Sequence, residues 1–296
     1  MAIRNAKDIK KPERSSFLLV GPPGSGKTTQ IHTMPGKGFV YGFDANIEAA
    51  IMGANCDYET FSGDVLDIDV HPLASKNQEK VKIATSKPPQ AYIEFEKSWR
   101  KNLESGVLDK YDYWWFDSAS TFALLIMDRV QWLNGRLGKH PEQADYTSQM
   151  HTFHNVMREA LYRHKVVVMT AHEKEKSEKE GTGYKLALTG DLRIRIPLLF
   201  GNIFRLENNR GEFSIITVSE RDHRYLRNNI RGLPAELDTT ITNWDHPRQY
   251  GLGRIMVEAG LLPGPAFKTS ILVKPGSVAT VKKVGPSRPL PPTRRT

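Results

Sequence analysis

The sequence has a single cysteine and no long hydrophobic run. Cys56 is the only cysteine among 296 residues, so the chain cannot form an internal disulfide, and a reducing compartment suits it. No apolar run approaches the roughly 20 residues that a membrane-spanning helix needs. Residues 1–8 lack the apolar core of a signal peptide. We therefore expect no membrane partner and a cytoplasmic location.

Acidic residues are missing from the end of the chain. Residues 263–296 contain seven basic residues, seven prolines and no Asp or Glu, and residues 1–14 contain five basic and two acidic residues. The two segments together account for the net charge of +9, which leaves the central part nearly neutral. Basic arms of this kind can bind phosphate backbones. A solvated tail that only aids solubility explains the charge equally well.

The segment GPPGSGKT, from Gly21 to Thr28, carries the most specific signal. It matches the pattern G-x-x-x-x-G-K-[ST] at every fixed position and follows an apolar run expected of a buried strand. Its glycines allow backbone N–H groups to surround a phosphate. Lys27 would reach the β- and γ-phosphates of ATP, and the Thr28 hydroxyl would bind Mg²⁺. The predicted nucleotide-binding residues are Gly21, Pro22, Pro23, Gly24, Ser25, Gly26, Lys27, Thr28 and Thr29.

Apolar runs alternate with helical patterns along the chain. The sequence predicts buried strands at 16–20, 39–44, 58–61, 113–117 and 166–171, and helices at 92–103, 121–137 and 147–164. Segments 203–207 and 213–218 flank a turn and predict a β-hairpin. Strands that alternate with helices around a phosphate loop form a mostly parallel sheet covered on both faces. The nucleotide then lies at the carboxyl ends of the strands.

Composition divides the chain into three parts. We predict a basic N-terminal arm over residues 1–14, an ATPase domain over 15–262, and a basic, proline-rich, disordered tail over 263–296. Residues 62–89 are polar and contain three prolines, which predicts a surface insertion. Residues 172–190 are charged and contain glycine, which predicts a long flexible loop.

Residues at strand ends supply the other candidates for the site. Asp117 ends the apolar run 113–116 and is predicted to be the second ligand of Mg²⁺. Hydrolysis also needs a group that orients water, and the candidates are Asp44, Glu48 and Glu173. His172 follows the strand at 166–171, and at that position its ring can contact the γ-phosphate.

Five segments together resemble the phage-encoded P-loop ATPases with a RecA-like core, a group of single-strand annealing and recombination ATPases. The segments are GPPGSGKTT, MPG followed by VYGFD, YWWFDS, VVVMTAHE, and LTGDLRIRIPLLF, and the resemblance covers about residues 15–232. It implies a three-layer α/β fold of RecA-like type, with a mostly parallel sheet, helices on both faces and a C-terminal β-hairpin. It also implies ATP and Mg²⁺ as cofactors and a role in phage DNA recombination or replication.

The resemblance assigns further roles residue by residue. Lys27 would act in catalysis, and His172 would take the place of a polar γ-phosphate sensor. The loop 173–190 would be the DNA-binding loop, and its lysines would contact the backbone of single-stranded DNA. These lysines are Lys174, Lys176, Lys179 and Lys185. The implied partners are single-stranded DNA, further copies of the chain in a ring or filament, and a single-stranded-DNA-binding protein, and a phage-encoded protein would lie in the host cytoplasm.

Two positions depart from the patterns of known ATPases. RecA-like proteins typically carry a catalytic Glu two residues after the acid that ends the second strand, where this chain has Asn46. Either Glu48 or Asp44 substitutes for it, or hydrolysis is slow. Ser118 follows Asp117 at a position where AAA+ motor ATPases usually place Glu, which argues against that class.

Three functions remain open at this point. The first is an ATP-hydrolysing, single-stranded-DNA-binding protein of phage recombination or replication. The second is a nucleotide or small-molecule kinase, because GPPGSGK followed by TTQ also resembles the start of adenylate kinases. The lack of a clear lid segment argues against it. The third is an ATP-gated DNA-binding module without significant turnover, which Asn46 favours.

Overall fold

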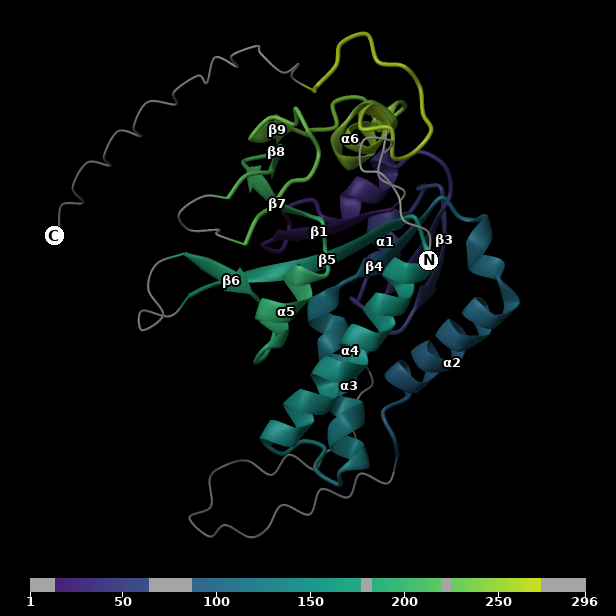
Figure 1. The fold of residues 1–296 in the computed structure, drawn as a ribbon, viewed down its shortest axis with the longest axis vertical. Coiled ribbons are helices and arrows are strands. Elements are labelled where there is room, and N and C mark those ends of the chain that lie inside the picture. Colours follow the sequence, from purple (N-terminus) through teal and green to yellow (C-terminus); the bar gives the residue numbers. More distant parts are fainter. Residues whose placement is uncertain (1–13, 64–86, 177–182, 220–224, 273–296) are drawn as a thin grey trace, which may run out of the picture.

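The structure is a computed structural model that describes residues 14–63, 87–176, 183–219 and 225–272. The described residues form a nine-stranded sheet with the strand order β3-β2-β4-β5-β1-β7-β8-β9, and β6 pairs with β5 outside this path (Figure 1). The six strands from β3 to β7 in this order run parallel to one another. Strands β8 and β9 and the short β6 are antiparallel to their neighbours.

The elements have the following bounds. The strands are β1 (Ser15–Gly21), β2 (Gly38–Gly42), β3 (Cys56–Thr60), β4 (Tyr113–Asp117), β5 (Val166–Glu175), β6 (Tyr184–Leu186), β7 (Asn202–Asn209), β8 (Glu212–Ile216) and β9 (Glu236–Asp238). The α-helices are α1 (Ile47–Ile51), α2 (Gln90–Ser105), α3 (Ala119–Leu133), α4 (Gln143–Arg163), α5 (Leu192–Leu198) and α6 (Gly251–Glu258). The 3₁₀ helices are η2 (Thr28–Thr33), η3 (Val107–Lys110) and η5 (Pro247–Gln249).

Two hydrophobic cores lie on opposite faces of the sheet. Side chains alternate between the faces along each strand, so Leu18 and Val20 of β1 join one core while Phe17 and Leu19 join the other. Helices α2 to α5 contribute to the first core, and η2, α1 and α6 contribute to the second (Figure 1). The predicted three-layer α/β fold, with a mostly parallel sheet between two helical layers, is confirmed.

The parallel register brings the carboxyl ends of four strands to one edge. Gly21, where the phosphate loop begins, lies opposite His172 of β5. Gly42 at the end of β2 lies opposite Asp117 at the end of β4. The polar residues at these strand ends therefore meet the phosphate loop at the same edge of the sheet.

Most of the predicted elements are present. The strands β1 to β5, the helices α2 to α4 and the β7–β8 hairpin all lie at or within a few residues of the predicted ranges. The predicted loop over residues 172–190 is wrong at 172–175 and 184–186, which form the end of β5 and the strand β6, while residues 177–182 lie outside the described residues. Leu186 and Leu188 are buried and hold the returning strand against the first core. Charge alone therefore gave the wrong prediction for this segment.

Some predictions lie outside the described residues. These are nearly all of the N-terminal arm, the central part of the 62–89 insertion, and the tail from residue 273 onward. The described part of the tail is in contact with the domain, since the Ile271 N–H donates a hydrogen bond of 2.8 Å to Glu258 in α6. The proposed boundary at residue 262 stays a prediction.

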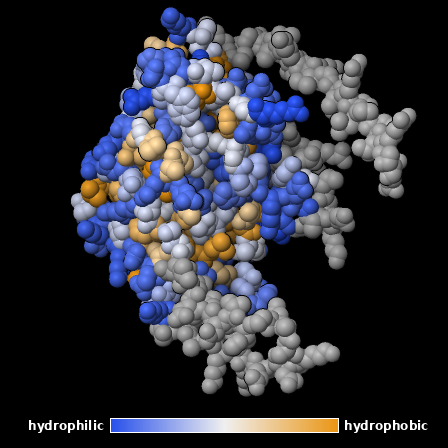
Figure 2. Space-filling model, turned by 180° about the vertical axis from the view of Figure 1, so that it is seen from behind, coloured by the Kyte–Doolittle hydropathy of each residue, from blue (hydrophilic) through white to orange (hydrophobic). Residues whose placement is uncertain are grey.

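The surface of the described residues is mainly polar. Figure 2 shows hydrophilic residues over most of one face, with hydrophobic residues in small separate areas. Among the described helices, none combines the length and the hydropathy that a membrane span requires.

Candidate nucleotide-binding site

The phosphate loop leaves β1 at Gly21 and passes into η2. Gly24 and Gly26 have φ angles of +75° and +83°, a region that strongly favours glycine. A Cβ atom on Gly21 would lie 2.5 Å from the carbonyl oxygen of Leu206 in β7, closer than any real contact. The backbone of the loop is therefore shaped by its glycines, as a phosphate cradle requires.

Lys27 is buried at the end of this loop. Its Nζ atom donates hydrogen bonds of 2.9 Å to the Gly21 carbonyl and 2.8 Å to the Pro22 carbonyl. Burial lowers the pKa of Lys27, while the nearby carboxylates of Asp117 and Asp44 act in the opposite direction. Lys27 thus lies between the loop and the acidic residues, where it can balance the charge of β- and γ-phosphates.

Thr28 and Asp117, the two residues predicted to bind Mg²⁺, are in direct contact. The Thr28 hydroxyl donates a hydrogen bond of 2.7 Å to Asp117 Oδ2, and the Thr170 hydroxyl donates one of 2.6 Å to Oδ1. Burial raises the pKa of Asp117, against the effect of these two hydrogen bonds. A carboxylate and a hydroxyl are the oxygen donors that Mg²⁺ prefers, and a cation would offset the burial of the carboxylate. The residues present therefore fit Mg²⁺, which Thr28 and Asp117 would hold.

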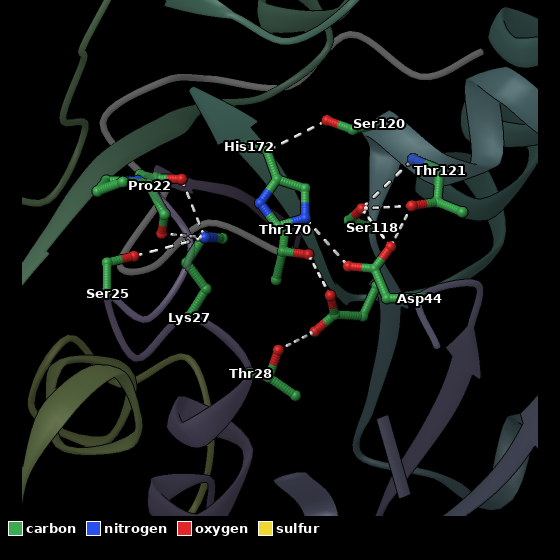
Figure 3. Close-up of polar contacts among 12 residues, drawn as sticks. Pro22, Ser25, Lys27, Thr28, Asp44, Ser118, Ser120, Thr121, Thr170 and His172 are labelled. Atoms are coloured by element: carbon green, nitrogen blue, oxygen red, sulfur yellow. Dashed lines mark hydrogen bonds and ion pairs between the residues drawn. The ribbon is translucent and has the colours of Figure 1, made fainter. Parts of the chain in front are cut away.

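Asp44 and His172 meet beside this donor set, and Figure 3 shows the His172 ring between Lys27 and Asp44. His172 Nε2 lies 3.2 Å from Asp44 Oδ2, and the Ser118 hydroxyl donates a hydrogen bond of 2.8 Å to Oδ1. The Thr121 hydroxyl also donates to Oδ1. Burial would raise the pKa of Asp44, but the hydrogen bonds from these three partners outweigh it and lower the pKa. Asp44 is thus an ionised carboxylate held in one orientation.

The second ring nitrogen of His172 is also placed for a role in the site. Nδ1 is buried and has no hydrogen-bond partner among the described residues. The backbone N–H of His172 donates to the Ser120 hydroxyl at 3.1 Å, which anchors the residue at its strand end. Because His172 lies opposite Gly21 in the β1–β5 register, its ring is next to the phosphate loop. The geometry suits contact with a phosphate on one side and with Asp44 on the other.

Glu48 does not join this cluster. Helix α1 buries Ile47 and Ile51, so Glu48 faces outward, where it interacts with the Tyr58 hydroxyl of β3. Asn46 is exposed and adopts a left-handed conformation with φ +65° at the start of α1. Of the two residues expected to substitute for the missing Glu, the structure therefore brings only Asp44 to the site.

Glu173 lies near the phosphate loop but is engaged in a buried ion pair. Arg205 Nε lies 2.8 Å from Glu173 Oε2, and the Tyr225 hydroxyl also donates to this carboxylate. Burial raises the pKa of Glu173, and Arg205 opposes that effect. The two charged side chains are only 6% and 1% exposed. Glu173 is thus oriented toward β7 rather than toward a water molecule at the γ-phosphate.

Three of the four predicted DNA-binding lysines lie on a two-stranded ribbon. Lys174 of β5 lies opposite Lys185 of β6 in the antiparallel register. The Lys176 N–H donates a hydrogen bond of 2.9 Å to the Gly183 carbonyl, which keeps the ribbon paired beyond the end of β5. Lys179 lies outside the described residues. The structure thus brings Lys174 and Lys185 together and keeps Lys176 on the same ribbon.

Sequence reasoning missed the residues that hold the acids in place. Thr170 and Thr121 donate to Asp117 and Asp44, and Arg205 pairs with Glu173. Thr170 could have been found from the sequence, since it is a polar residue inside an otherwise apolar strand. Arg205 could not have been found in this way, because nothing in the hairpin pattern indicates that this arginine is buried.

These elements define a class. A glycine-rich loop between a buried strand and a helix, with a lysine and threonine facing an acid on a nearby parallel strand, is the site of a P-loop nucleotide-binding ATPase domain. In the strand order, β5 separates the loop strand β1 from the acid-bearing strand β4.

The sequence comparison identifies the family. Residues 13–226, well over half of the chain, match the family described as the AAA domain. The chain therefore belongs to the AAA domain family. Ser118 follows Asp117 in this chain, so no carboxylate stands directly after the acid that ends β4. No curated protein matches the sequence.

The solved structures that match the chain include the following two. The flagellar accessory protein FlaH from Methanocaldococcus jannaschii is 12% identical, with 78% of this chain and 87% of that chain covered and a TM-score of 0.33. The KaiC-like protein PH0186 from Pyrococcus horikoshii OT3 is 14% identical, with 80% and 89% covered and a TM-score of 0.39. Similarities at these values carry no information about function.

Proposed function

We propose that this protein binds Mg²⁺·ATP and hydrolyses it slowly, with Asp44 as the residue that activates water. The observation that carries the proposal is the position of Asp44, whose carboxylate contacts His172 and Ser118 beside the Lys27–Thr28–Asp117 set. Asp44 is the carboxylate at this edge that neither forms the metal donor set nor belongs to the buried pair with Arg205. It therefore takes the role that Asn46 cannot fill.

The mechanism assigns one task to each residue. Asp44 orients a water molecule toward the γ-phosphorus and accepts its proton as the new P–O bond forms and the bond to the β-phosphate breaks. Lys27 balances the negative charge on the phosphate oxygens, and His172, with both ring nitrogens protonated, donates Nε2–H to Asp44 and Nδ1–H to the γ-phosphate. Bound Mg²⁺, held by Thr28 and Asp117, would neutralise charge on the β- and γ-phosphates. The products are ADP and phosphate.

Single-stranded DNA is the proposed partner of the β5–β6 ribbon. Lys174 and Lys185 lie side by side on the ribbon whose strand β5 also carries His172, so a phosphate backbone bound there would lie close to the nucleotide site. The basic N-terminal arm and tail add to the attraction for DNA. We further propose a phage recombination or replication role as a homo-oligomer, together with a single-stranded-DNA-binding protein.

A specific observation also favours ATP-gated DNA binding without turnover. The hydrogen bonds to Asp44 lower its pKa, and a carboxylate with a low pKa is a weak acceptor of protons. Asn46 is exposed and supplies no replacement. On this account ATP binding would change the affinity of the β5–β6 ribbon for DNA, and hydrolysis would not be needed for this change.

One experiment separates these functions. Purified protein is mixed with Mg²⁺·ATP and labelled single-stranded DNA, and bound nucleotide, bound DNA and free ADP are all quantified. ADP formation together with DNA binding supports the hydrolase. Bound ATP and DNA without ADP supports the gated module, and a protein that binds no ATP contradicts both.

A further inference from the structure

Helix α6 is docked on η2, the short helix that follows the phosphate loop. The Leu252 N–H donates a hydrogen bond of 2.8 Å to Gln30 Oε1, and the Gly253 N–H donates one of 3.0 Å to Thr33 Oγ1. Gln30 and Thr33 are both buried. The first N–H groups of a helix have no partner within that helix, and here side chains of η2 provide the partners. More than 200 residues of chain separate the two helices, yet they lie side by side (Figure 1).

Glycine is required at two positions of this contact. A Cβ atom on Gly253 would lie 1.8 Å from the carbonyl oxygen of Thr33, which is a backbone atom and cannot rotate away. A Cβ atom on Gly251 would lie 2.2 Å from Gln30 Oε1, and Gly251 also has φ +61°. At Gly253 the backbone of α6 therefore approaches the backbone of η2 more closely than a residue with a Cβ atom would allow.

A second contact comes from the segment just before α6. The ring of Trp244 meets the ring of His32 edge-on, with centroids 5.5 Å apart. Leu252 and Met256 share the second core with Ile31 and Met34, the apolar residues of η2 and its C-cap. All of these α6-side residues lie beyond residue 226, where the match to the AAA domain family ends. The contacts on this side of η2 thus come from residues outside the matched range.

The rest of the phosphate loop is held by other elements. The Asn208 side chain donates a hydrogen bond of 3.1 Å to the Gly24 carbonyl, and Gly21 is in close contact with Leu206. Both Asn208 and Leu206 belong to β7. Thr28, in contrast, is the first residue of η2 and moves with it. Helix α6 thus contacts the element that begins with Thr28, whereas β7 contacts the loop upstream of it.

We propose that α6 is a positioning element of the metal half of the nucleotide site, with Gln30, Thr33 and Gly253 as its positioning residues. It sets the orientation of η2, so that Thr28 and Asp117 reach the same Mg²⁺ ion. The inference rests on the proposed binding of Mg²⁺·ATP. It predicts that disruption of the contact weakens the Mg²⁺-dependent part of nucleotide binding and spares the part that needs no metal.

The test is the substitution Gly253→Ala, with Gly63→Ala as the matched control. Alanine favours a helix over glycine, so the substitution by itself should not weaken α6, and any decrease in binding comes from the clash with Thr33. The same change at Gly63 places a Cβ atom 3.7 Å from Leu125, an ordinary contact. Binding of a fluorescent ATP analogue is titrated against Mg²⁺ and repeated in EDTA, and thermal unfolding is recorded for each protein.

The expected result is a decrease of about 10–100-fold in the apparent Mg²⁺ affinity of Gly253→Ala, the size of effect that a misplaced group produces, with binding in EDTA unchanged. Gly63→Ala should match the wild type. An equal decrease in binding with and without Mg²⁺, or no decrease, overturns the inference. Failure of the wild type to bind nucleotide at all contradicts the proposed function instead, so the two failures are distinguishable.

A second pair of variants decides the question if Gly253→Ala does not fold. Thr33→Val keeps the shape of the side chain but removes the acceptor of the Gly253 N–H, and Thr33→Ser keeps the acceptor. A raised Mg²⁺ requirement in Thr33→Val that is restored in Thr33→Ser supports the proposal. Equal behaviour of the two variants contradicts it.

Discussion

The Thr28 hydroxyl donates a hydrogen bond of 2.7 Å to the carboxylate of Asp117, although 89 positions separate the two residues in the chain. This bond joins η2 to the end of β4 and places the two oxygen donors of the site in direct contact. It exists because β4 lies in parallel register with the neighbouring strands β2 and β5. The same register places Asp44 and His172 at the adjoining strand ends.

The substitution Asp44→Asn tests the residue that activates water. We expect turnover to fall by about 10²–10⁴-fold, the usual contribution of a general base, while the affinity for Mg²⁺·ATP stays close to that of the wild type. The matched control is Glu48→Gln, which should leave turnover unchanged because Glu48 faces solvent beside Tyr58. Steady-state ADP release and nucleotide titration provide the two readouts. Loss of activity in Glu48→Gln alone would contradict the assignment.

The pH dependence of turnover tests the state of Asp44. Hydrogen bonds hold the pKa of Asp44 below its ordinary value, so the carboxylate is ionised at any pH above that lowered pKa. Turnover should therefore fall only as the pH falls through the pKa of Asp44. The substitution His172→Ala removes the largest of the lowering contributions. The acid limb of the pH–rate profile should therefore move to higher pH in His172→Ala, within the pH range where circular dichroism shows both proteins folded. A limb that moves to lower pH would rule out this role for His172.

The buried ion pair between Arg205 and Glu173 should dominate the stability of the region around β7. Arg205→Met removes the cationic partner of the buried Glu173 carboxylate, and we expect a decrease of about 3–5 kcal/mol in the free energy of unfolding. Arg100→Met is the control, since the Arg100–Glu96 pair is 70% and 40% exposed and exposed pairs contribute about 0–1 kcal/mol. Urea unfolding measures both. Similar decreases in the two variants would show that burial of the pair does not matter.

The ribbon lysines give a prediction for DNA binding. In the double variant Lys174→Ala/Lys185→Ala, affinity for single-stranded DNA should fall, and the slope of log K against log salt should become shallower by about 0.7 for each phosphate that the variant no longer binds. Lys97→Ala/Lys101→Ala on α2 is the control, because it removes the same charge from another surface. Fluorescence anisotropy over a salt series measures the slope. An identical decrease in DNA affinity in both double variants would show that only the total charge matters and that the ribbon is not a specific DNA-binding site.

Much of the fold follows from patterns that are local in the sequence. The apolar runs at 17–20 and 113–116 are buried on both faces and could only be central strands. The extension of β5 to Glu175 was not predictable in this way. Its residues are charged, and they form a strand because β6 returns beside them and Glu173 pairs with Arg205 in β7. Helix α6 was missed because its glycine-containing start depends on Gln30 and Thr33, more than 200 positions away.

In the site, too, some residues were predictable from local sequence patterns and others only from the packing of the structure. Lys27, Thr28 and Asp117 were predicted because a spaced motif and a strand end determine where they lie. The choice between Asp44 and Glu48 depended on which face of α1 is buried, and only the packing of Ile47 and Ile51 decides that. Sequence reasoning can therefore name the residues that are candidates to touch the nucleotide, whereas the residues that orient them require the structure.

The measurement that tests the central claim most directly is ATP hydrolysis by the purified protein, with and without single-stranded DNA, beside Lys27→Ala. Lys27 is the cation that the loop carbonyls hold next to the acids, so its removal should abolish tight binding of ATP. The account predicts slow turnover that rises with DNA and is absent in Lys27→Ala. Turnover that persists unchanged in Lys27→Ala would contradict the assignment of the phosphate loop and, with it, the proposed function.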